Sequence, residues 1–276
     1  MTNRPPAITQ LRGTGDIGTL TLDWKPVSWA TVVDHYAVYV AEPGSTTYTL
    51  LGKTVYPHYV HRGLGFTGVT RSYRVVTVDA AGNRSKESAP VAAANKTSVT
   101  VSGQPIARVG LYDGKGSELA LSPKGYADYP ARFPSDVDYT YGTSVPSADW
   151  SYLLPGPSDK WAGSKNHTVR FRFDLAAVPE QDLDLALWLI DSHASIPGAA
   201  LLSVNGTEVG RLAFANGATK GSTIADSTYP GSPLKPSYVE KPLPKALFRT
   251  GQNVIELFKD NGSWIAYDAF GVYARR

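Results

Sequence analysis

The chain of 276 residues contains no cysteine and a single methionine. Without cysteine there can be no disulfide framework, no thiolate metal site and no cysteine nucleophile. No stretch approaches the roughly 20 apolar residues that cross a bilayer, and the N-terminus lacks the charged start and apolar middle of a signal peptide. The net charge of +3 is small and dispersed, without a run of Lys and Arg. We therefore expect neither a nucleic-acid partner nor a membrane partner.

The residues that are abundant favour strands and turns. The chain has 26 Gly, 20 Pro and 16 Tyr, together with many Thr and Val. This composition is typical of many short strands with frequent turns, so the predicted fold class is all-β. The length suits two ordinary domains. A small-residue-rich stretch at residues 88–97 predicts a boundary between a domain at 1–96 and a domain at 97–276.

In the first domain, apolar and polar residues alternate with period two, as they do in half-buried strands. The alternating stretches are residues 18–24, 35–40 and 73–78. With the turn at residues 79–85, their sequences resemble a fibronectin type III module. The resemblance implies a seven-strand β-sandwich with Trp24 and Tyr36 in its core and Tyr73 on its penultimate strand. It implies no activity.

The second domain has clearer strands and no convincing helix. Residues 168–174 and 183–190 alternate, and Asn205-Gly206 lies between two apolar arms, which is a strong hairpin signal. The apolar runs 254–258 and 265–273 flank a turn at residues 260–263 and are predicted to form a closing β-hairpin. About eight strands of this kind predict a jelly-roll β-sandwich.

The order of short motifs in residues 105–276 resembles the C-terminal, carbohydrate-binding-module-like domain of family 4 polysaccharide lyases, the rhamnogalacturonan lyases. The motifs are Val109-Gly-Leu-Tyr-Asp113, Val137-Asp-Tyr-Thr-Tyr-Gly-Thr-Ser144, Asp149-Trp150, Val169-Arg-Phe171, Ser203-Val-Asn-Gly206, Gly251-Gln-Asn-Val-Ile255 and Tyr267-Asp-Ala-Phe270. In those lyases a fibronectin type III-like domain precedes this one, and catalysis takes place in a large N-terminal domain without a counterpart here. The resemblance implies an ancillary region of a larger, secreted enzyme that degrades an acidic, pectin-like polysaccharide.

Sugar binding needs a planar aromatic to stack on a pyranose and polar groups to bond its hydroxyls or pair with uronates. The candidates are Trp161, Trp264, Lys160, Asn261, Trp188, Trp150, Tyr152, Tyr229, Tyr238 and Lys220. Trp161 comes first because its neighbours are typical of a loop, where an indole has less core to enter. Lys220, Tyr229 and Tyr238 belong to a long irregular segment whose lysines suit an acidic polysaccharide. Packing inside the domain is the alternative for each aromatic, and a solvated loop is the alternative for the segment.

Neither a cofactor nor catalysis is expected, although a structural calcium ion is possible. Jelly-roll sugar modules often hold calcium through acidic residues, and Asp113, Glu118 and Asp268 are the acids available. His193 follows Asp191 and Ser192, but consecutive residues point in different directions and cannot form a triad by themselves. No catalytic residue is therefore predicted.

The leading hypothesis is a monomeric, non-catalytic polysaccharide-binding module with its fibronectin type III spacer, joined to a catalytic domain of the same parent chain. The alternative is a pair of scaffold domains that pack against that catalytic domain. A self-sufficient esterase or lyase is the third and least favoured hypothesis.

Overall fold

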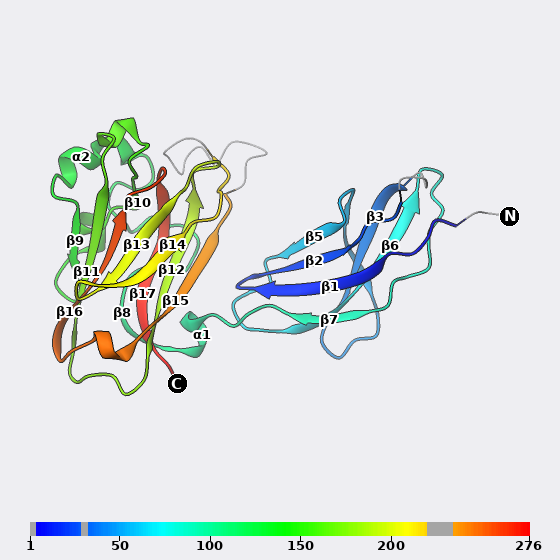
Figure 1. Cartoon of the computed structure of the whole chain (residues 1–276), viewed down its shortest axis with the longest axis horizontal. Helices are drawn as coiled ribbons and strands as arrows, with labels where there is room; N and C mark the ends of the chain where they lie inside the picture. Colours follow the sequence, from blue (N-terminus) through cyan, green and yellow to red (C-terminus); the bar gives the residue numbers. More distant parts are fainter. Residues whose placement is uncertain (1–3, 29–32, 220–233) are drawn as a thin grey trace. The chain divides into compact units, whose positions relative to one another are not determined.

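A computed structural model describes residues 4–28, 33–219 and 234–276. The chain is all-β, as predicted, and it divides into two compact units, Met1–Val101 and Ser102–Arg276 (Figure 1). The sequence places the boundary after residue 96, and the division by contacts falls after Val101. None of the helices in the described residues is long and apolar enough to cross a membrane.

Unit 1 is a sandwich of two antiparallel sheets. One sheet has the order β1-β2-β5, from β1 (Thr9–Asp16), β2 (Thr19–Lys25) and β5 (His58–Arg62). The other has the order β4-β3-β6-β7, from β4 (Thr49–Thr54), β3 (Val33–Ala41), β6 (Thr70–Asp79) and β7 (Val91–Ala94). This is the strand arrangement of a fibronectin type III domain and confirms the predicted fold.

The core of unit 1 follows from the alternation in its strands. Leu20, Leu22 and Trp24 point into the sandwich from β2, and the indole of Trp24 packs edge-on against Tyr36 with ring centroids 5.3 Å apart. Tyr73 lies on β6, the penultimate strand, and is fully buried. Trp24, Tyr36 and Tyr73 therefore have the positions that the resemblance implies.

Unit 2 is a larger sandwich, and we call its two sheets sheet I and sheet II. Sheet I has the order β10-β17-β12-β15, with β8 also paired to β17; its strands are β8 (Gln104–Gly110), β10 (Leu153–Leu154), β12 (Leu183–Ser192), β15 (Ser237–Leu243) and β17 (Ile265–Ala274). Sheet II has the order β14-β13-β16-β11-β9; its strands are β9 (Val137–Thr140), β11 (His167–Leu175), β13 (Ala199–Val204), β14 (Thr207–Ala213) and β16 (Gly251–Lys259). This pair of sheets is the β-sandwich predicted for the second domain (Figure 1).

Helical segments are short and lie between strands. They are α1 (Val99–Ser102), η1 (Gly125–Asp128), α2 (Tyr129–Arg132), α3 (Pro146–Asp149), η2 (Lys160–Ala162) and η4 (Lys245–Leu247). Sequence periodicity does not reveal such single turns, because a helical pattern needs several turns to show.

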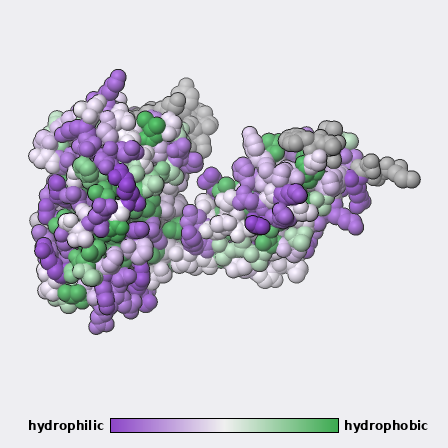
Figure 2. All heavy atoms as spheres, in the orientation of Figure 1, coloured by the Kyte–Doolittle hydropathy of each residue, from purple (hydrophilic) through white to green (hydrophobic). Residues whose placement is uncertain are grey.

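The core of unit 2 lies between the sheets. Leu183, Leu185, Leu187 and Leu189 face it from β12, and Phe171 faces it from β11. Hydrophobic residues at the visible surface form small areas among hydrophilic ones (Figure 2). The alternation therefore identifies the core side of β11 and β12, although β12 is buried on both faces.

The two turns with Asn and Gly behave differently. Asn205 and Gly206 both have positive φ, and β13 pairs directly with β14 on either side of them, so this hairpin is confirmed. The predicted closing hairpin is wrong. β16 pairs with β13 and β11 in sheet II, whereas β17 pairs with β12, β8 and β10 in sheet I. The turn at residues 260–264 therefore crosses from one sheet to the other.

Candidate functional site

The turn between β16 and β17 meets three other loops and forms a cavity with them. The cavity has a volume of about 450 Å³, and we call it the loop-end pocket. It is lined by Ser158, Ser195, Ile196, Pro197, Gly198, Phe214, Asn216, Asn261 and Gly262. These residues come from four segments that are far apart in the sequence, so only the folded sandwich brings them together.

Glycines let the backbones of these loops touch. Gly198 and Gly262 have φ values of +72° and +74°. A Cβ atom on Gly262 would lie 2.5 Å from the Cα of Gly198, and one on Gly156 would lie 2.3 Å from the carbonyl oxygen of Gly262. Side chains at these positions would force the loops apart.

Backbone hydrogen bonds join the same loops. The amide of Ser158 donates to the carbonyl oxygen of Gly262 over 3.0 Å, and the amide of Ser263 donates to that of Ile196 over 2.7 Å. The amide of Phe214 donates to the carbonyl oxygen of Gly198 over 3.0 Å. Each loop around the pocket is thus bonded to a neighbouring loop, and the pocket is formed before any ligand arrives.

A buried carboxylate adds to this framework. Asp159 accepts a hydrogen bond from the amide of Gly156 over 2.8 Å and one from the hydroxyl of Ser263 over 2.5 Å. Its two oxygens therefore link the loop before η2 to the turn between the sheets. Asp159 is almost fully buried, so these bonds replace the water that the carboxylate loses.

A buried lysine lies behind the pocket wall. Lys259 has an exposed fraction of 0%, and its Nζ donates to the carbonyl oxygen of Pro197 over 2.6 Å and to that of Asn261. The same nitrogen lies 5.4 Å from the centre of the Phe214 ring. Burial lowers the pKa of Lys259 to about 8, which the nearby Asp159 partly opposes.

The pocket lining combines free polar groups with apolar ones. Ser158, Ser195, Asn216 and Asn261 are exposed, and within the described residues their side chains make no hydrogen bond. Ile196, which is 48% exposed, adds an apolar surface. Such a lining can bond hydroxyl groups and contact the C–H face of a ring.

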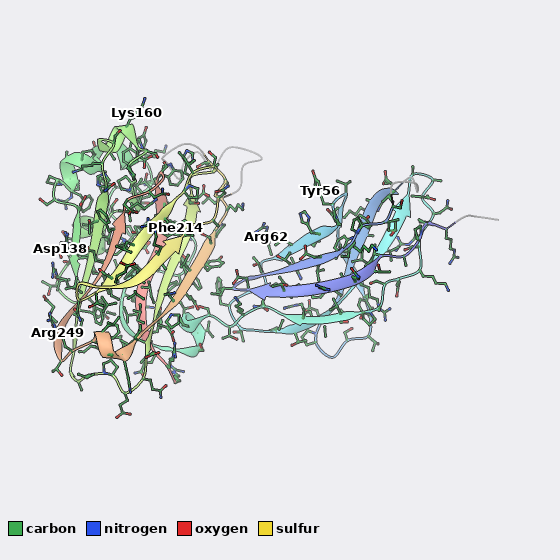
Figure 3. The ribbon with its side chains drawn as sticks, in the orientation of Figure 1. Tyr56, Arg62, Asp138, Lys160, Phe214 and Arg249 are labelled. Carbon is green, nitrogen blue, oxygen red and sulfur yellow. The ribbon has the colours of Figure 1, made fainter. Side chains whose placement is uncertain are left out.

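Asn261 is the predicted site residue that lines this pocket. Lys160 and Trp161 lie close in sequence, on η2, but do not line it. The indole of Trp161 packs edge-on against Tyr126 at 5.3 Å and Tyr129 at 6.5 Å, and is half-buried. Lys160 is exposed, and its side chain projects outward at the upper end of unit 2 (Figure 3).

Several aromatic candidates are buried, which corrects their assignment as sugar platforms. Trp150 and Tyr152 belong to the core, where Trp150 lies 5.3 Å from the ring of Tyr267. Trp264 is 3% exposed and lies edge-on to the ring of His193. Stacking on a pyranose needs an open ring face, and these side chains present none.

Trp188 alternates with the leucines of β12 and so points away from their side, but it is 1% exposed. Its ring lies 4.6 Å from that of Tyr112 and 4.7 Å from that of the half-buried Tyr238. This aromatic cluster lies on the outer side of sheet I, so Trp188 packs and is not open to a sugar. Lys220 and Tyr229 lie outside the described residues.

The acidic residues that are predicted to bind calcium accept hydrogen bonds from backbone amides of the loop at residues 111–115. Asp268 accepts from the amide of Gly114 over 2.8 Å, Asp113 accepts from that of Lys115 over 3.0 Å, and Glu118 accepts from the amide of Leu111. Among the described residues no three His, Asp or Glu side chains are close enough to share a metal ion. A calcium ion in this loop stays a prediction, and backbone oxygens would have to supply most of its ligands.

The three residues that resemble a catalytic triad in the sequence form hydrogen bonds with different segments. Nδ1 of His193 accepts from the amides of Ser195 and Ile196, at 3.3 and 3.1 Å. The hydroxyl of Ser192 donates to the carbonyl oxygen of Ala215, and Asp191 accepts from the amide of Ala218 over 2.8 Å. These contacts shape the loops beside the pocket and do not form a nucleophile, base and acid in series.

Comparisons with known proteins address both units. A family model described as "CBM-like: Polysaccharide lyase family 4, domain III" matches residues 105–270, which is more than half of the chain. No curated protein matches.

Solved structures with a similar fold include the fibronectin type-III domain of human fibronectin type III domain containing protein 3. Its sequence identity to this chain is 16% and the TM-score is 0.32. The match covers 36% of this chain and 93% of that one. They also include a β-1,2-glucanase from Parabacteroides distasonis, at 20% identity and a TM-score of 0.28, covering 35% of this chain and 14% of that one. A Family 28 exopolygalacturonase from Yersinia enterocolitica has 18% identity and a TM-score of 0.28, covering 33% of this chain and 20% of that one.

Proposed function

The chain belongs to the family of the CBM-like domain III of polysaccharide lyase family 4, and from this membership we propose that it is the non-catalytic, polysaccharide-binding region of a larger carbohydrate-active enzyme. In this proposal unit 2 binds the glycan and unit 1 is a spacer. The catalytic domain belongs to the same parent chain, and this region is a monomer. The parent is secreted, because a polymeric glycan is met outside the cell.

We place glycan binding at the loop-end pocket. The main support for this location is that loops already bonded to each other present polar side chains without hydrogen bonds among the described residues. These are Ser158, Ser195, Asn216 and Asn261. Ligand binding costs least where the protein does not have to order its own groups. The buried aromatic candidates support the same choice, because they cannot stack on a sugar.

The polysaccharide we propose is the acidic, pectin-like polymer that the resemblance implies. Calorimetry with pectic and other acidic glycans, beside neutral ones, tests this directly. Asn261→Ala should weaken binding about two- to tenfold, because a lost hydrogen bond at a binding site costs about 0.5–1.5 kcal/mol. Gln252→Ala is the matched control, since Gln252 is exposed at the opposite end of β16.

Two outcomes would contradict the proposal. No binding across a broad glycan panel would favour the scaffold alternative, in which both units only support a catalytic domain. Turnover of any glycan by this chain, lost in His193→Ala, would instead favour the self-sufficient enzyme.

A further inference from the structure

The charges around the loop-end pocket indicate which part of a polysaccharide it accepts. We propose that this pocket takes an uncharged sugar unit and rejects a uronate, even when the polymer as a whole is acidic. This inference rests on the proposed function, because it concerns the ligand of the same site. Its starting point is that none of the described residues lining the pocket carries a charge.

The buried cation behind the pocket wall is already hydrogen-bonded. Lys259 is fully buried, and its ammonium group donates to the carbonyl oxygens of Pro197 and Asn261, two residues of the pocket wall. Lys259 therefore cannot turn to a carboxylate of a bound sugar without leaving these two carbonyl oxygens unbonded, which is costly because the bond to Pro197 is buried.

The cation beside the β16–β17 turn is also paired. Both terminal nitrogens of Arg211 donate to the carboxylate of Asp260, which directly precedes Asn261. A two-bond pair of this kind fixes the guanidinium and neutralises its charge. Lys160, on η2, is exposed and does not line the pocket.

Two carboxylates flank the lining residues. Asp159 follows Ser158, and Asp260 precedes Asn261. Both are already bonded, Asp159 to Gly156 and Ser263 and Asp260 to Arg211. A uronate in the pocket would lose part of its hydration, and no described lining residue offers a cation to pair with it. Since desolvating an unpaired carboxylate is expensive, the pocket should exclude it.

An uncharged sugar fits the same surroundings. The free hydroxyl and amide groups of Ser158, Ser195, Asn216 and Asn261 can donate to or accept from sugar hydroxyls. Apolar contacts for C–H groups come from the remaining large side chains of the lining, Ile196, Pro197 and Phe214. The volume of about 450 Å³ lies near the lower end of the range of roughly 300–1,000 Å³ for small-molecule sites. The pocket therefore suits a short piece of a polymer.

The test uses matched pairs of oligosaccharides that differ in charge. Trisaccharides of the gluco, galacto and manno series are compared with the corresponding tri-uronates, in which each primary alcohol is a carboxylate. Calorimetry with the whole chain should show that a neutral member binds at least about tenfold more tightly than its uronate. Its affinity should not change between low and high salt, because no ion pair forms.

Variants decide whether the pocket is responsible. Asn261→Ala should weaken binding of the neutral ligand, and Gln252→Ala should not. Asn216→Lys adds a cation to the lining and should strengthen uronate binding up to about fivefold, the usual limit for an exposed ion pair. Circular dichroism checks that each variant is folded.

The outcomes separate this inference from the proposed function. If a uronate binds as tightly as its neutral partner and Asn261→Ala weakens both, the inference is wrong and the proposed function stands. If the neutral ligand binds but Asn261→Ala changes nothing, the pocket is not the site and the inference is wrong. If no member of any pair binds, the inference and the proposed function both fail.

Discussion

Lys259 holds its ammonium nitrogen 2.6 Å from the carbonyl oxygen of Pro197, although the lysine is fully buried at the end of a sheet II strand. A second bond to the carbonyl oxygen of Asn261 ties the crossing from sheet II to sheet I to the loop after β12. The lysine thus fixes two walls of the loop-end pocket at once. Its contribution is structural, and it can be measured separately from glycan binding.

Replacing this lysine should destabilise unit 2. In Lys259→Met an apolar side chain is kept, but the carbonyl oxygens of Pro197 and Asn261 lose their donor. Because the bond to Pro197 is buried, its loss costs about 1–3 kcal/mol. Urea unfolding at pH 7 measures the loss. Lys165→Met is the control, because Lys165 is exposed and surface changes usually stay within about 0.5 kcal/mol. Equal stability of the two variants would contradict the structural role.

The unsubstituted protein and Lys259→Met should also differ in pH dependence. Burial lowers the pKa of Lys259 from 10.5 to about 8, so between these values the unfolded chain binds more protons than the folded one. The free energy of unfolding of the unsubstituted protein should therefore rise relative to the variant across this range, by up to about 1.4 kcal/mol per pH unit. Well below this range the difference should be constant. Parallel curves from neutral to alkaline pH would show that the buried amine does not titrate there.

The contact between Gly262 and Gly198 gives another prediction. Gly262 and Gly206 both have positive φ, +74° and +82°, so alanine strains the backbone similarly at either position. Gly262 is also crowded, because a Cβ atom there would lie 2.5 Å from the Cα of Gly198, whereas nothing lies within 4 Å of one at Gly206. Gly262→Ala should therefore cost about 1–3 kcal/mol more than Gly206→Ala. Thermal unfolding compares the two, and an equal loss would mean that the loops separate freely.

Much of the fold could be predicted because it is encoded locally. Alternation over residues 183–190 identifies the core side of β12, and the positive φ values that Asn and Gly tolerate identify the β13–β14 hairpin. The turn at residues 260–263 carries the same local signal, but it does not say with which strands its arms will pair. Those partners, such as β13 and β12, lie far away in the sequence. The residues of the turn therefore indicate that the chain reverses its direction there, but not that it passes from one sheet to the other.

The candidate site was less predictable for the same reason. Asn261 could be named because it lies at an evident turn, whereas Ser158, Ser195 and Asn216 are ordinary loop residues in the sequence. The glycines of these loops were a usable signal, since they mark places of close backbone approach. The alternation over residues 183–190 places Trp188 opposite the leucines, but its packing depends on Tyr112, which is distant in sequence.

Trp188 should matter for folding and not for sugar binding. Its indole packs against both Tyr112 and Tyr238. Trp188→Ala should lower the free energy of unfolding by about 3–5 kcal/mol, as for other large buried side chains. Glycan affinity of the folded fraction should be unchanged, with the exposed Lys160→Ala as a control for stability. A stable Trp188→Ala protein with weakened glycan binding would restore the platform interpretation.

The stability of unit 2 in mild acid should depend on Asp268. Burial raises the pKa of Asp268 from 3.8 to about 6, and the nearby Asp113 adds to this, against the hydrogen bond from the amide of Gly114. Because the folded state holds the proton more tightly than the unfolded state, Asp268 stabilises the fold below pH 3.8, and this contribution is lost as the pH rises to about 6.

Asp268→Asn removes that titration while keeping a side-chain oxygen that can accept from Gly114. The free energy of unfolding of the unsubstituted protein should therefore fall relative to the variant as the pH rises through this window, by up to about 1.4 kcal/mol per pH unit, and the difference should level off above it. Urea titrations at several pH values measure both curves. Asp138→Asn is the control, because Asp138 is exposed and pairs with Arg172. A constant difference between Asp268→Asn and the unsubstituted protein would mean that the carboxyl group stays hydrated and that the loop carrying Gly114 does not cover it.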